Sequence, residues 1–565
     1  MRLLQALCVM GIISSMMAGQ TGAQNADPGQ STMINELKNL RDAMTEQQKS
    51  MAEQQKAMAE QQSQIAAQQR EIERLRQQVS TQSQAVSAKS GNVSPQLLNT
   101  ALTTNGTSSS LAPPRTDAAI QETQPKESPL SFRIGGADFT PGGFIDFENV
   151  FRTTNTGNAA TTSFNAIPFS TSSAGHLTEF KSTAQYSRIN LTVTDKFGAN
   201  NVTGYLESDF NGNDAATVFQ TTNPHTLRLR LYWLDIKRGK WEFLGGQSWG
   251  WLTPNRNGLS PVPSDLATTV NEDSNINVGV HHTRAAQFRV AYHPNDHWAM
   301  GVALENPDQF VGANTVTFPN AFALGVNNLN GQFDNGNLGI PSVSPDIISK
   351  IAYDTKIAGR HFHAETAGLF TTAKVAVEPT GSTAFTSHTA IGGGVEAAAN
   401  IDLFKRFRLL ANGIYSDGAG RYLIGTGPQA VVLPTATGTN VRVSMVHSGG
   451  GLAGFEAQVT PKSLLAAYYG GFYFQRNFAL DNTAGAKANT FVGYGGPGSG
   501  NGANRALQEA TIDWIQTFWK NPQYGAVLLN TQVSYLTRAP WVVAPGAPKN
   551  AHLGMSYVSL RYVLP

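Results

Sequence analysis

The sequence predicts an all-β transmembrane barrel of about 16 antiparallel strands, preceded by an α-helical coiled-coil stalk. The segment 226–232 reads Thr-Leu-Arg-Leu-Arg-Leu-Tyr, so leucine and arginine alternate along it. A strand directs alternate side chains to opposite faces, which gives this segment one face suited to lipid and one suited to water or anions. Similar alternation recurs from about residue 132 onward, and it is typical of a barrel with an apolar outside and a polar lumen.

Residues 1–23 predict a cleaved secretory signal. Arg2 precedes an apolar run that ends at Met17, and small residues precede the expected cleavage after Ala23. The only cysteine, Cys8, lies inside this run, so we expect a mature chain without disulfides or thiol chemistry. Beyond the signal, no uninterrupted apolar run reaches the about 18 residues that a transmembrane helix needs. If the chain spans a membrane, we expect it to do so with strands.

Residues 31–88 show a seven-residue repeat. Its companion core column is mostly glutamine, a choice that lowers stability and can set register and oligomeric state. We expect a coiled coil about 85 Å long, and hence an oligomer; the alternative is a solvated single helix in a Gln-rich tail. The main core column consists of Leu37, Met44, Met51, Met58, Ile65, Ile72, Val79 and Val86. Residues 89–131 are rich in Ser, Thr, Asn and Pro and are expected to form a flexible linker.

The barrel domain is expected to span 132–565. Short alternating segments there are separated by clusters of Gly, Asn, Asp and Pro. In one of them, Ile145 and Phe147 alternate with Asp146 and Glu148. The expected strands include 143–151, 187–194, 202–210, 287–292, 348–353, 395–401, 408–415 and 558–564.

The alternation around the arginine pair breaks after Leu231. If the strand continued regularly, Trp233 and Asp235 would share the lipid-facing parity of Leu231. A β-bulge, or the end of the membrane zone, would explain the break.

Several short motifs, taken in order, resemble the DcaP-like family of trimeric outer-membrane porins. They are Leu-Arg-Leu-Arg-Leu-Tyr at 227–232, Leu-Gly-Gly-Gln-Ser-Trp at 244–249, Ala-Leu-Glu-Asn-Pro at 303–307, Pro-Asp at 345–346 with Lys350 and Tyr353, and Asp-Gly-Ala-Gly-Arg-Tyr at 417–422. The signal, heptad stalk and linker also resemble members of that family. The resemblance implies a homotrimer, a periplasmic N-terminal coiled coil, and uptake of small, often anionic solutes through an arginine-lined constriction.

The resemblance also assigns positions. The family's arginine pair falls on Arg228 and Arg230, and its Gly-Gln-Thr-Trp type motif includes Gln247. The following loop, about 250–278, would fold into the barrel as a constriction loop. Its acidic residues would face the arginine wall and set a transverse field: Asp265, Glu272 and Asp273. This loop departs from the family by being rich in Asn, Thr and Pro, and the sequence ends in Tyr-Val-Leu-Pro rather than in an aromatic residue.

The expected pore-lining residues share the inward parity of their segments. An arginine that faces lipid at the bilayer midplane is destabilising by about 2–4 kcal/mol, so lumenal placement follows if the barrel forms. The guanidinium groups either bind carboxylates or phosphates of a solute, or pair with wall carboxylates and merely line a wet wall. The expected set comprises Arg188, Arg228, Arg230, Arg289, Arg421, Glu207, Asp209 and Gln247, and the candidate structural partners also include Asp146 and Glu148.

Enzyme, metal and cofactor sites are not expected. Gly-Gln-Ser-Trp-Gly at 246–250 matches the nucleophile-elbow pattern of serine hydrolases around Ser248, but no helix signal follows it. The histidine pairs are not accompanied by carboxylate clusters in the sequence and are better explained as turn or interfacial residues: His281 and His282, His293 and His297, and His361 and His363. Charged residues make up 14% of the chain and the net charge is +2, so no basic tail indicates nucleic acid.

The sequence therefore favours an outer-membrane porin that allows passive diffusion of small hydrophilic solutes, with a preference for carboxylate-type anions. The expected partners are further copies of this chain, outer-membrane lipid and small solutes, with peptidoglycan as a candidate partner of the periplasmic stalk. One alternative is an envelope-tethering or adhesion protein whose barrel is a closed anchor. Another is an outer-membrane hydrolase that uses Ser248.

Overall fold

The computed structural model describes residues 128–565 except 158–160, 213–225, 262–266, 271–275, 308–309, 311–314, 321–342, 378, 380 and 383. The expected signal, coiled coil and most of the linker lie outside these residues. No helix within the described residues is long and apolar enough to cross a membrane.

Sixteen antiparallel strands form a closed barrel, because the strands pair in succession around the ring and β22 pairs back with β2. This confirms the expected barrel. The first eight wall strands are β2 (Ala137–Arg152), β4 (Arg188–Phe197), β5 (Asn200–Asp209), β6 (Arg228–Arg238), β7 (Trp241–Trp249), β8 (Arg284–Asn295), β9 (Trp298–Glu305) and β10 (Asp346–Ile357). The others are β11 (Arg360–Val377), β12 (Thr386–Phe404), β13 (Phe407–Asp417), β16 (His447–Thr460), β17 (Ser463–Phe474), β20 (Asn504–Asn521), β21 (Gly525–Pro540) and β22 (Ala551–Val563).

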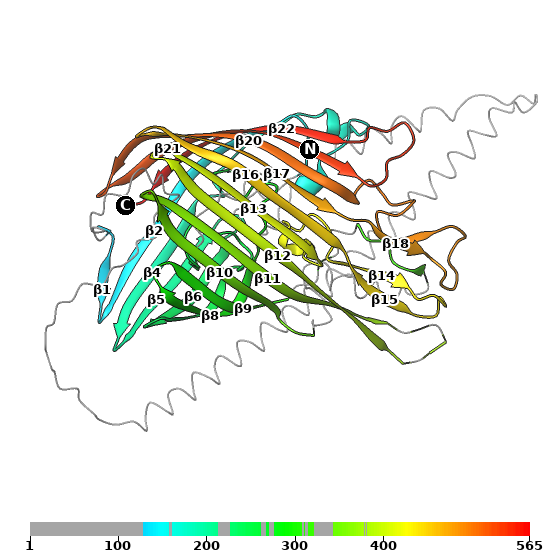
Figure 1. The fold of residues 1–565 in the computed structure, drawn as a ribbon. Helices are drawn as coiled ribbons and strands as arrows, with labels where there is room; N and C mark the ends of the chain where they lie inside the picture. The colour runs from blue at the N-terminus through cyan, green and yellow to red at the C-terminus, as the bar shows by residue number, and fades with distance from the viewer. Residues whose placement is uncertain are drawn as a thin grey trace, which may run out of the picture. The chain divides into compact units, whose positions relative to one another are not determined.

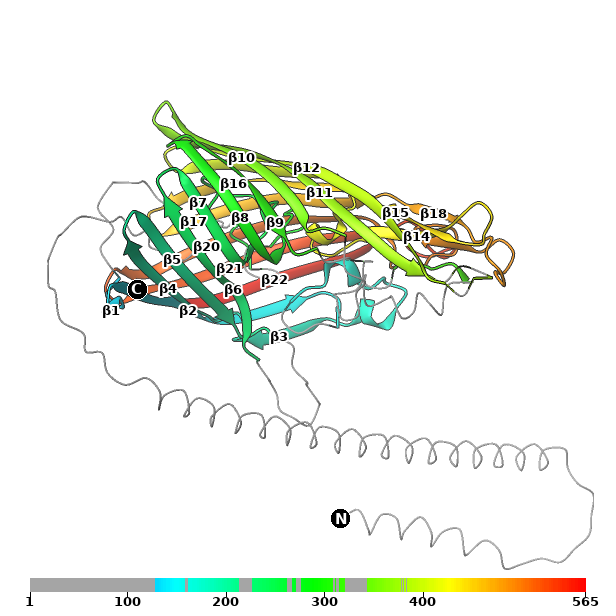
Figure 2. The same ribbon diagram turned by 90° about the horizontal axis from the view of Figure 1, so that it is seen from below.

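Short turns join strands at one end of the barrel and long connections join them at the other. Gly198 and Gly359 lie in two of the short turns and adopt positive φ, 59° and 77°, which glycine tolerates without strain. The C-terminus and β1 lie at the short-turn end, and β14, β15 and β18 at the long-connection end (Figures 1 and 2). The smaller elements are β1 (Phe132–Ile134) and β3 (Glu179–Thr183), which pair with β2, the hairpins β14 (Ala430–Pro434) with β15 (Val441–Met445) and β18 (Asn477–Leu480) with β19 (Phe491–Tyr494), and the 3-10 turns η1 (Phe164–Ala166), η2 (Ser173–His176) and η4 (Gly420–Tyr422).

The two faces of each wall strand carry different side chains, as the alternation predicts. In β2, Ile145 is 63% exposed on the outside, whereas Asp146 and Glu148 are each 1% exposed on the inside. In β22, Leu560 is exposed outside and Arg561 is buried inside. Apolar groups face lipid without loss of free energy, while polar groups gain partners in the lumen, so this pattern fixes which face of the sheet is concave.

A β-bulge in β6 changes which residues face the lumen. Glu207 pairs with Leu231 while the next residue, Ser208, pairs with Leu229, so Arg230 is the extra residue. Leu231 is consequently only 1% exposed and packs with Tyr205, Trp233 and Leu244. The expectation that Leu231 faces lipid is wrong, and of the two explanations for the broken alternation the bulge is confirmed, because one inserted residue reverses the parity of everything after it.

Candidate functional site in the barrel lumen

The connection between β7 and β8, residues 250–283, folds into the lumen. Wall side chains far away along the chain accept hydrogen bonds from its backbone N–H groups, at 2.7–2.9 Å. A backbone group inside the barrel needs such partners because it is removed from bulk water. The acceptors and donors are Glu305 with Trp251, Glu365 with Asn255, Asp354 with Gly258, Gln532 with Val270, and Glu509 with Val278.

Side chains of the loop add further anchors on the same wall. Arg256 donates to both carboxylate oxygens of Glu456 on β16, in a fork with one bond of 2.8 Å. Thr268 donates to Asp513 on β20 at 2.7 Å. The loop therefore crosses from β7 to the β9–β21 wall, and it engages the carboxylates there. The expected infolding of this loop is observed, while Asp265, Glu272 and Asp273 lie outside the described residues.

Backbone-to-backbone contact between the loop and the wall is very close at two glycines. A Cβ atom built on Gly470 of β17 would lie 1.9 Å from the carbonyl oxygen of Val278. One built on Gly279, which has φ of +104°, would lie 2.3 Å from the carbonyl oxygen of Gly451. Only glycine permits this approach, so these positions set how far the loop sinks toward the wall.

The opposite wall, formed by β22, β2, β4, β5 and β6, carries a row of alternating charges. We call it the charge ladder and define it as Arg561, Asp146, Arg188, Glu207, Arg230, Asp209 and Arg228. Its contacts are Arg561 to Asp146 at 2.5 Å, Arg188 to Glu207 at 3.6 Å, Arg230 to Glu207 at 2.8 Å and to Asp209 at 2.9 Å, and Arg228 to Asp209 at 2.6 Å.

The two arginines of the 227–232 motif occupy different environments within this ladder. Arg230 is 1% exposed and holds two carboxylates at once. Arg228 is 27% exposed and forms a bidentate pair with Asp209 at 2.9 and 2.6 Å. The geometry suits Arg230 to holding the wall together, whereas Arg228 retains a surface that a solute can reach.

A cavity of about 410 Å³ lies where Arg228 ends the ladder. It is bounded by β6, β7, the end of the infolded loop and the β13–β14 connection. Among its described lining residues are three arginines, one histidine and no acidic residue. The lining consists of Arg228, Leu229, Gln247, His282, Thr283, Arg284, Phe310, Arg421, Ile424 and Gly425.

Arg421 reaches this cavity from a loop and not from a strand. The expected inward strand parity for Arg421 is wrong, because the residue lies in η4. Its guanidinium donates to Asp346 at 2.5 Å and to the hydroxyl of Tyr422 at 2.7 Å. Although burial alone would lower the pKa of Arg421, Tyr422, Asp346 and Glu305 beside it raise that pKa, so the cation persists at every accessible pH. Burial raises the pKa of Tyr422 well above its ordinary value, so its hydroxyl stays protonated.

Gln247 and Arg289 support the site in different ways. Gln247 lines the cavity and its amide donates to the carbonyl of Arg230 at 2.7 Å, which fixes the bulged backbone of β6. Arg289 is almost fully buried, donates to the carbonyl of Trp249 and to Gln287, and lies over the ring of Trp251 at 5.3 Å. Arg289 thus holds the start of the infolded loop and is not among the described residues that line the cavity.

Sequence patterning does not identify Arg284 and His282. Arg284 has the opposite parity to Arg289 within β8, so the alternation does not place it with the inward arginines. The fold brings it to the cavity, where its guanidinium lies 5.4 Å from the ring of Trp249. His282 follows the infolded loop, and its backbone N–H donates to Tyr422 at 2.8 Å. No local pattern signals either contact, because both depend on two long loops meeting.

The other sequence candidates have structural partners. Ser248 is an interior residue of β7, not of a strand-to-helix turn, and its hydroxyl donates to the carbonyl of Pro261 at 2.5 Å. This differs from the geometry that a nucleophile elbow requires. The histidines lie beside carboxylates: His281 beside Glu396 at 3.7 Å, His293 beside Glu242 at 2.8 Å, and His361 and His363 beside Asp354 at 3.6 and 2.8 Å.

Comparison with known proteins gives a fold. No family model matches the chain, and no curated protein matches its sequence. The outer-membrane channel DcaP of Acinetobacter baumannii is similar in structure, with a TM-score of 0.52 and 19% identity over 76% of this chain and 98% of that chain. OmpT of Vibrio cholerae (TM-score 0.40, 10% identity, 77% and 99% covered) and an anion-selective porin from Comamonas acidovorans (0.40, 10%, 76% and 100%) are more distant. The described chain therefore has the closed β-barrel fold of the DcaP channel.

Proposed function

We propose that this protein is an outer-membrane porin that allows passive diffusion of small hydrophilic solutes and prefers carboxylate-type anions. The observation that carries the proposal is the cavity at the end of the charge ladder, whose described lining contains three arginines and no acidic residue. The barrel fold shared with the DcaP channel supports a transmembrane location. Diffusion down a gradient needs no other energy source.

The two walls of the lumen differ in the charge that they offer a solute. On the β9–β21 wall, carboxylates are engaged by the infolded loop, as with Glu305, Glu365 and Glu509. On the ladder wall, four arginines alternate with three carboxylates, which leaves one excess positive charge at the cavity end. An anion entering the cavity meets guanidinium forks, which bind carboxylates in a bidentate manner and raise their local concentration.

The remaining parts of the chain complete the proposal. Residues 1–23 direct export, residues 31–88 form a periplasmic coiled coil, and residues 89–131 link it to the barrel domain, 132–565. The heptad repeat supports self-association, which we propose to be a homotrimer through stalk and barrel, with peptidoglycan as a candidate partner of the stalk.

Single-channel recording of the reconstituted full chain in a planar bilayer tests the proposal. We expect stepwise closure in threes and an anion-selective reversal potential in a salt gradient. Arg228→Ala should shift the reversal potential toward cation selectivity, because it removes the partly exposed cation of the cavity. Arg238→Ala is the matched control: it removes the same charge from the other, exposed end of the same strand and should leave selectivity at the wild-type value. Equal shifts in the two variants would contradict an arginine site at the cavity.

One observation favours a second candidate, a closed anchor for envelope tethering or adhesion. Loop residues pack into a buried apolar cluster within the barrel, including Trp251, Leu252, Leu423, Val432 and Tyr494. Such packing would fill part of the lumen. A correctly folded barrel that never conducts in the bilayer experiment would overturn the porin and favour this anchor.

A further inference from the structure

A row of polar side chains lies on the outer face of the barrel at its long-connection end. Asp417 of β13 pairs directly with His447 of β16, and Gly393 of β12 pairs with Asp417 on its other side. These residues have the outward parity of their strands, because Tyr415, two residues before Asp417, is 67% exposed. The row is therefore on the lipid-facing surface and not in the lumen.

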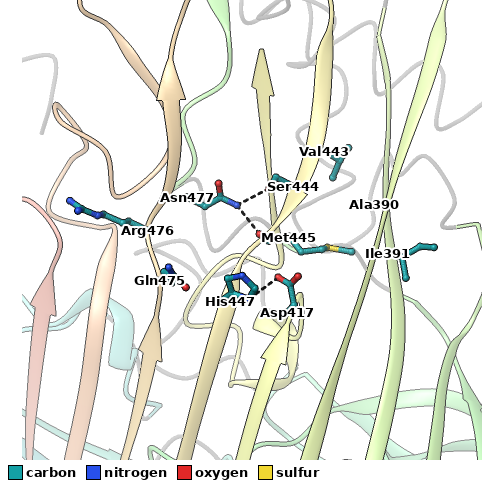
Figure 3. Close-up of a pocket in the computed structure, with 10 residues that line it drawn as sticks. All are labelled: Ala390, Ile391, Asp417, Val443, Ser444, Met445, His447, Gln475, Arg476 and Asn477. Carbon is teal, nitrogen blue, oxygen red and sulfur yellow. Dashed lines mark hydrogen bonds and ion pairs between the residues drawn. The ribbon is translucent and has the colours of Figure 1, made fainter. Parts of the chain in front are cut away.

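A pocket of about 400 Å³ opens along this row (Figure 3). His447 lies 3.3 Å from Asp417, and the amide of Asn477 donates to Ser444 at 3.0 Å and to the carbonyl of Met445 at 2.7 Å. Hydroxyl-binding groups next to an apolar side chain, Ile391, are the combination that suits a sugar ring. The pocket is lined by Ala390, Ile391, Asp417, Val443, Ser444, Met445, His447, Gln475, Arg476 and Asn477.

Two exposed arginines flank a tryptophan beside the pocket. Arg476 lies 5.4 Å and Arg505 lies 5.8 Å from the ring of Trp541. The indole N–H of Trp541 donates to the carbonyl of Phe474 at 2.9 Å, so the ring is fixed. Throughout the described residues neither arginine takes part in a salt bridge, in contrast to the arginines of the charge ladder. Their charge is available to an external anion.

The depth of the row matches a lipid headgroup. Tyr415 and Tyr473 point outward two residues closer to the middle of their strands than Asp417 and Gln475, and both are exposed. Aromatic residues of this kind mark the edge of the hydrocarbon zone in membrane barrels. Two strand residues span about 7 Å, so the polar row lies just outside that edge, where headgroup phosphates lie.

We propose that this rim pocket, together with Arg476 and Arg505, docks the headgroup of a phosphorylated glycolipid of the outer leaflet. The sugar occupies the pocket, where Asp417 and the side-chain amides bind its hydroxyls. A phosphate lies against the two arginines, whose planar forks match phosphate geometry. The inference rests on the proposed outer-membrane location, but it does not depend on whether the lumen conducts.

Binding of lipid A to delipidated full-length protein, measured by native mass spectrometry in detergent, tests this site. The double variant Arg476→Ala/Arg505→Ala should bind bisphosphorylated lipid A roughly tenfold more weakly than wild type, because two charge-assisted contacts are lost. The matched control is Arg360→Ala: Arg360 is also exposed and lies 5.7 Å from the ring of Phe404, but at the opposite end of the barrel. It should bind like wild type.

Further arms of the experiment distinguish the ligand and separate this inference from the porin proposal. Wild type should bind enzymatically dephosphorylated lipid A as weakly as the double variant binds the phosphorylated form, a result that does not require the variant to fold. Equal binding by wild type and the double variant, equal weakening in Arg360→Ala, or displacement by millimolar inorganic phosphate would overturn the docking site. A protein that conducts but binds no lipid A refutes the docking site alone; one that binds lipid A but never conducts refutes the porin alone.

Discussion

Replacing Arg230 with alanine is expected to destabilise the barrel much more than replacing Arg228, although both belong to the same motif. Arg230 is 1% exposed and its guanidinium lies 2.8 Å from Glu207 and 2.9 Å from Asp209, which are themselves nearly fully buried. Removing one partner of a buried pair leaves uncompensated charge and lowers the free energy of unfolding by about 3–5 kcal/mol.

The loss in Arg228→Ala is smaller for a structural reason. Asp209 keeps its contact with Arg230 in this variant, and the Arg228 side chain is 27% exposed, so water replaces part of what is lost. We expect a decrease of about 1 kcal/mol. The difference between the two variants, about 2 kcal/mol or more, corresponds to at least a roughly 30-fold change in the ratio of folded to unfolded protein.

Reversible denaturant unfolding in lipid vesicles measures both values. Tryptophan fluorescence is a suitable signal, because the ring of Trp249 lies 5.9 Å from the Arg230 guanidinium. Adding Glu207→Gln to Arg230→Ala should restore part of the lost stability, since it removes a buried charge that has lost its main partner. Equal stability of Arg228→Ala and Arg230→Ala, or no recovery in the double variant, would refute the distinction between a structural and a solute-facing arginine.

Two other substitutions test the loop and the hydrolase hypothesis. Gly470→Ala should displace the infolded loop and change single-channel conductance, because its Cβ would lie 1.9 Å from the carbonyl oxygen of Val278; Gly471→Ala, whose Cβ would meet nothing closer than 3.1 Å, should conduct like wild type, and identical conductance of both would count against the close packing. Ser248→Ala should lower the free energy of unfolding by about 1 kcal/mol through loss of the bond to Pro261 and leave conductance intact; ester hydrolysis by wild type that disappears in this variant would instead support an enzyme.

Most of the barrel could be predicted from local sequence, and the reason is the period of two. Lipid on one side and water on the other impose the same constraint on every strand, so residues such as Ile145 and Asp146 report their own faces. The bulge in β6 shows the limit. The sequence indicates a break near Trp233, but the choice of Arg230 as the extra residue depends on which residues of β5 lie opposite.

The candidate site divides in the same way. Sequence by itself determined the fold class, the inward charges of the strands and the infolding loop, because these follow from alternation and from a family resemblance. Only the tertiary structure decided that Arg230 is buried between two carboxylates, that Arg284 and Arg421 join Arg228 around one cavity, and that the loop engages the acids of the far wall. These contacts link residues separated by up to hundreds of positions, and such pairings arise from ring closure and loop packing, which leave no periodic signal in the chain.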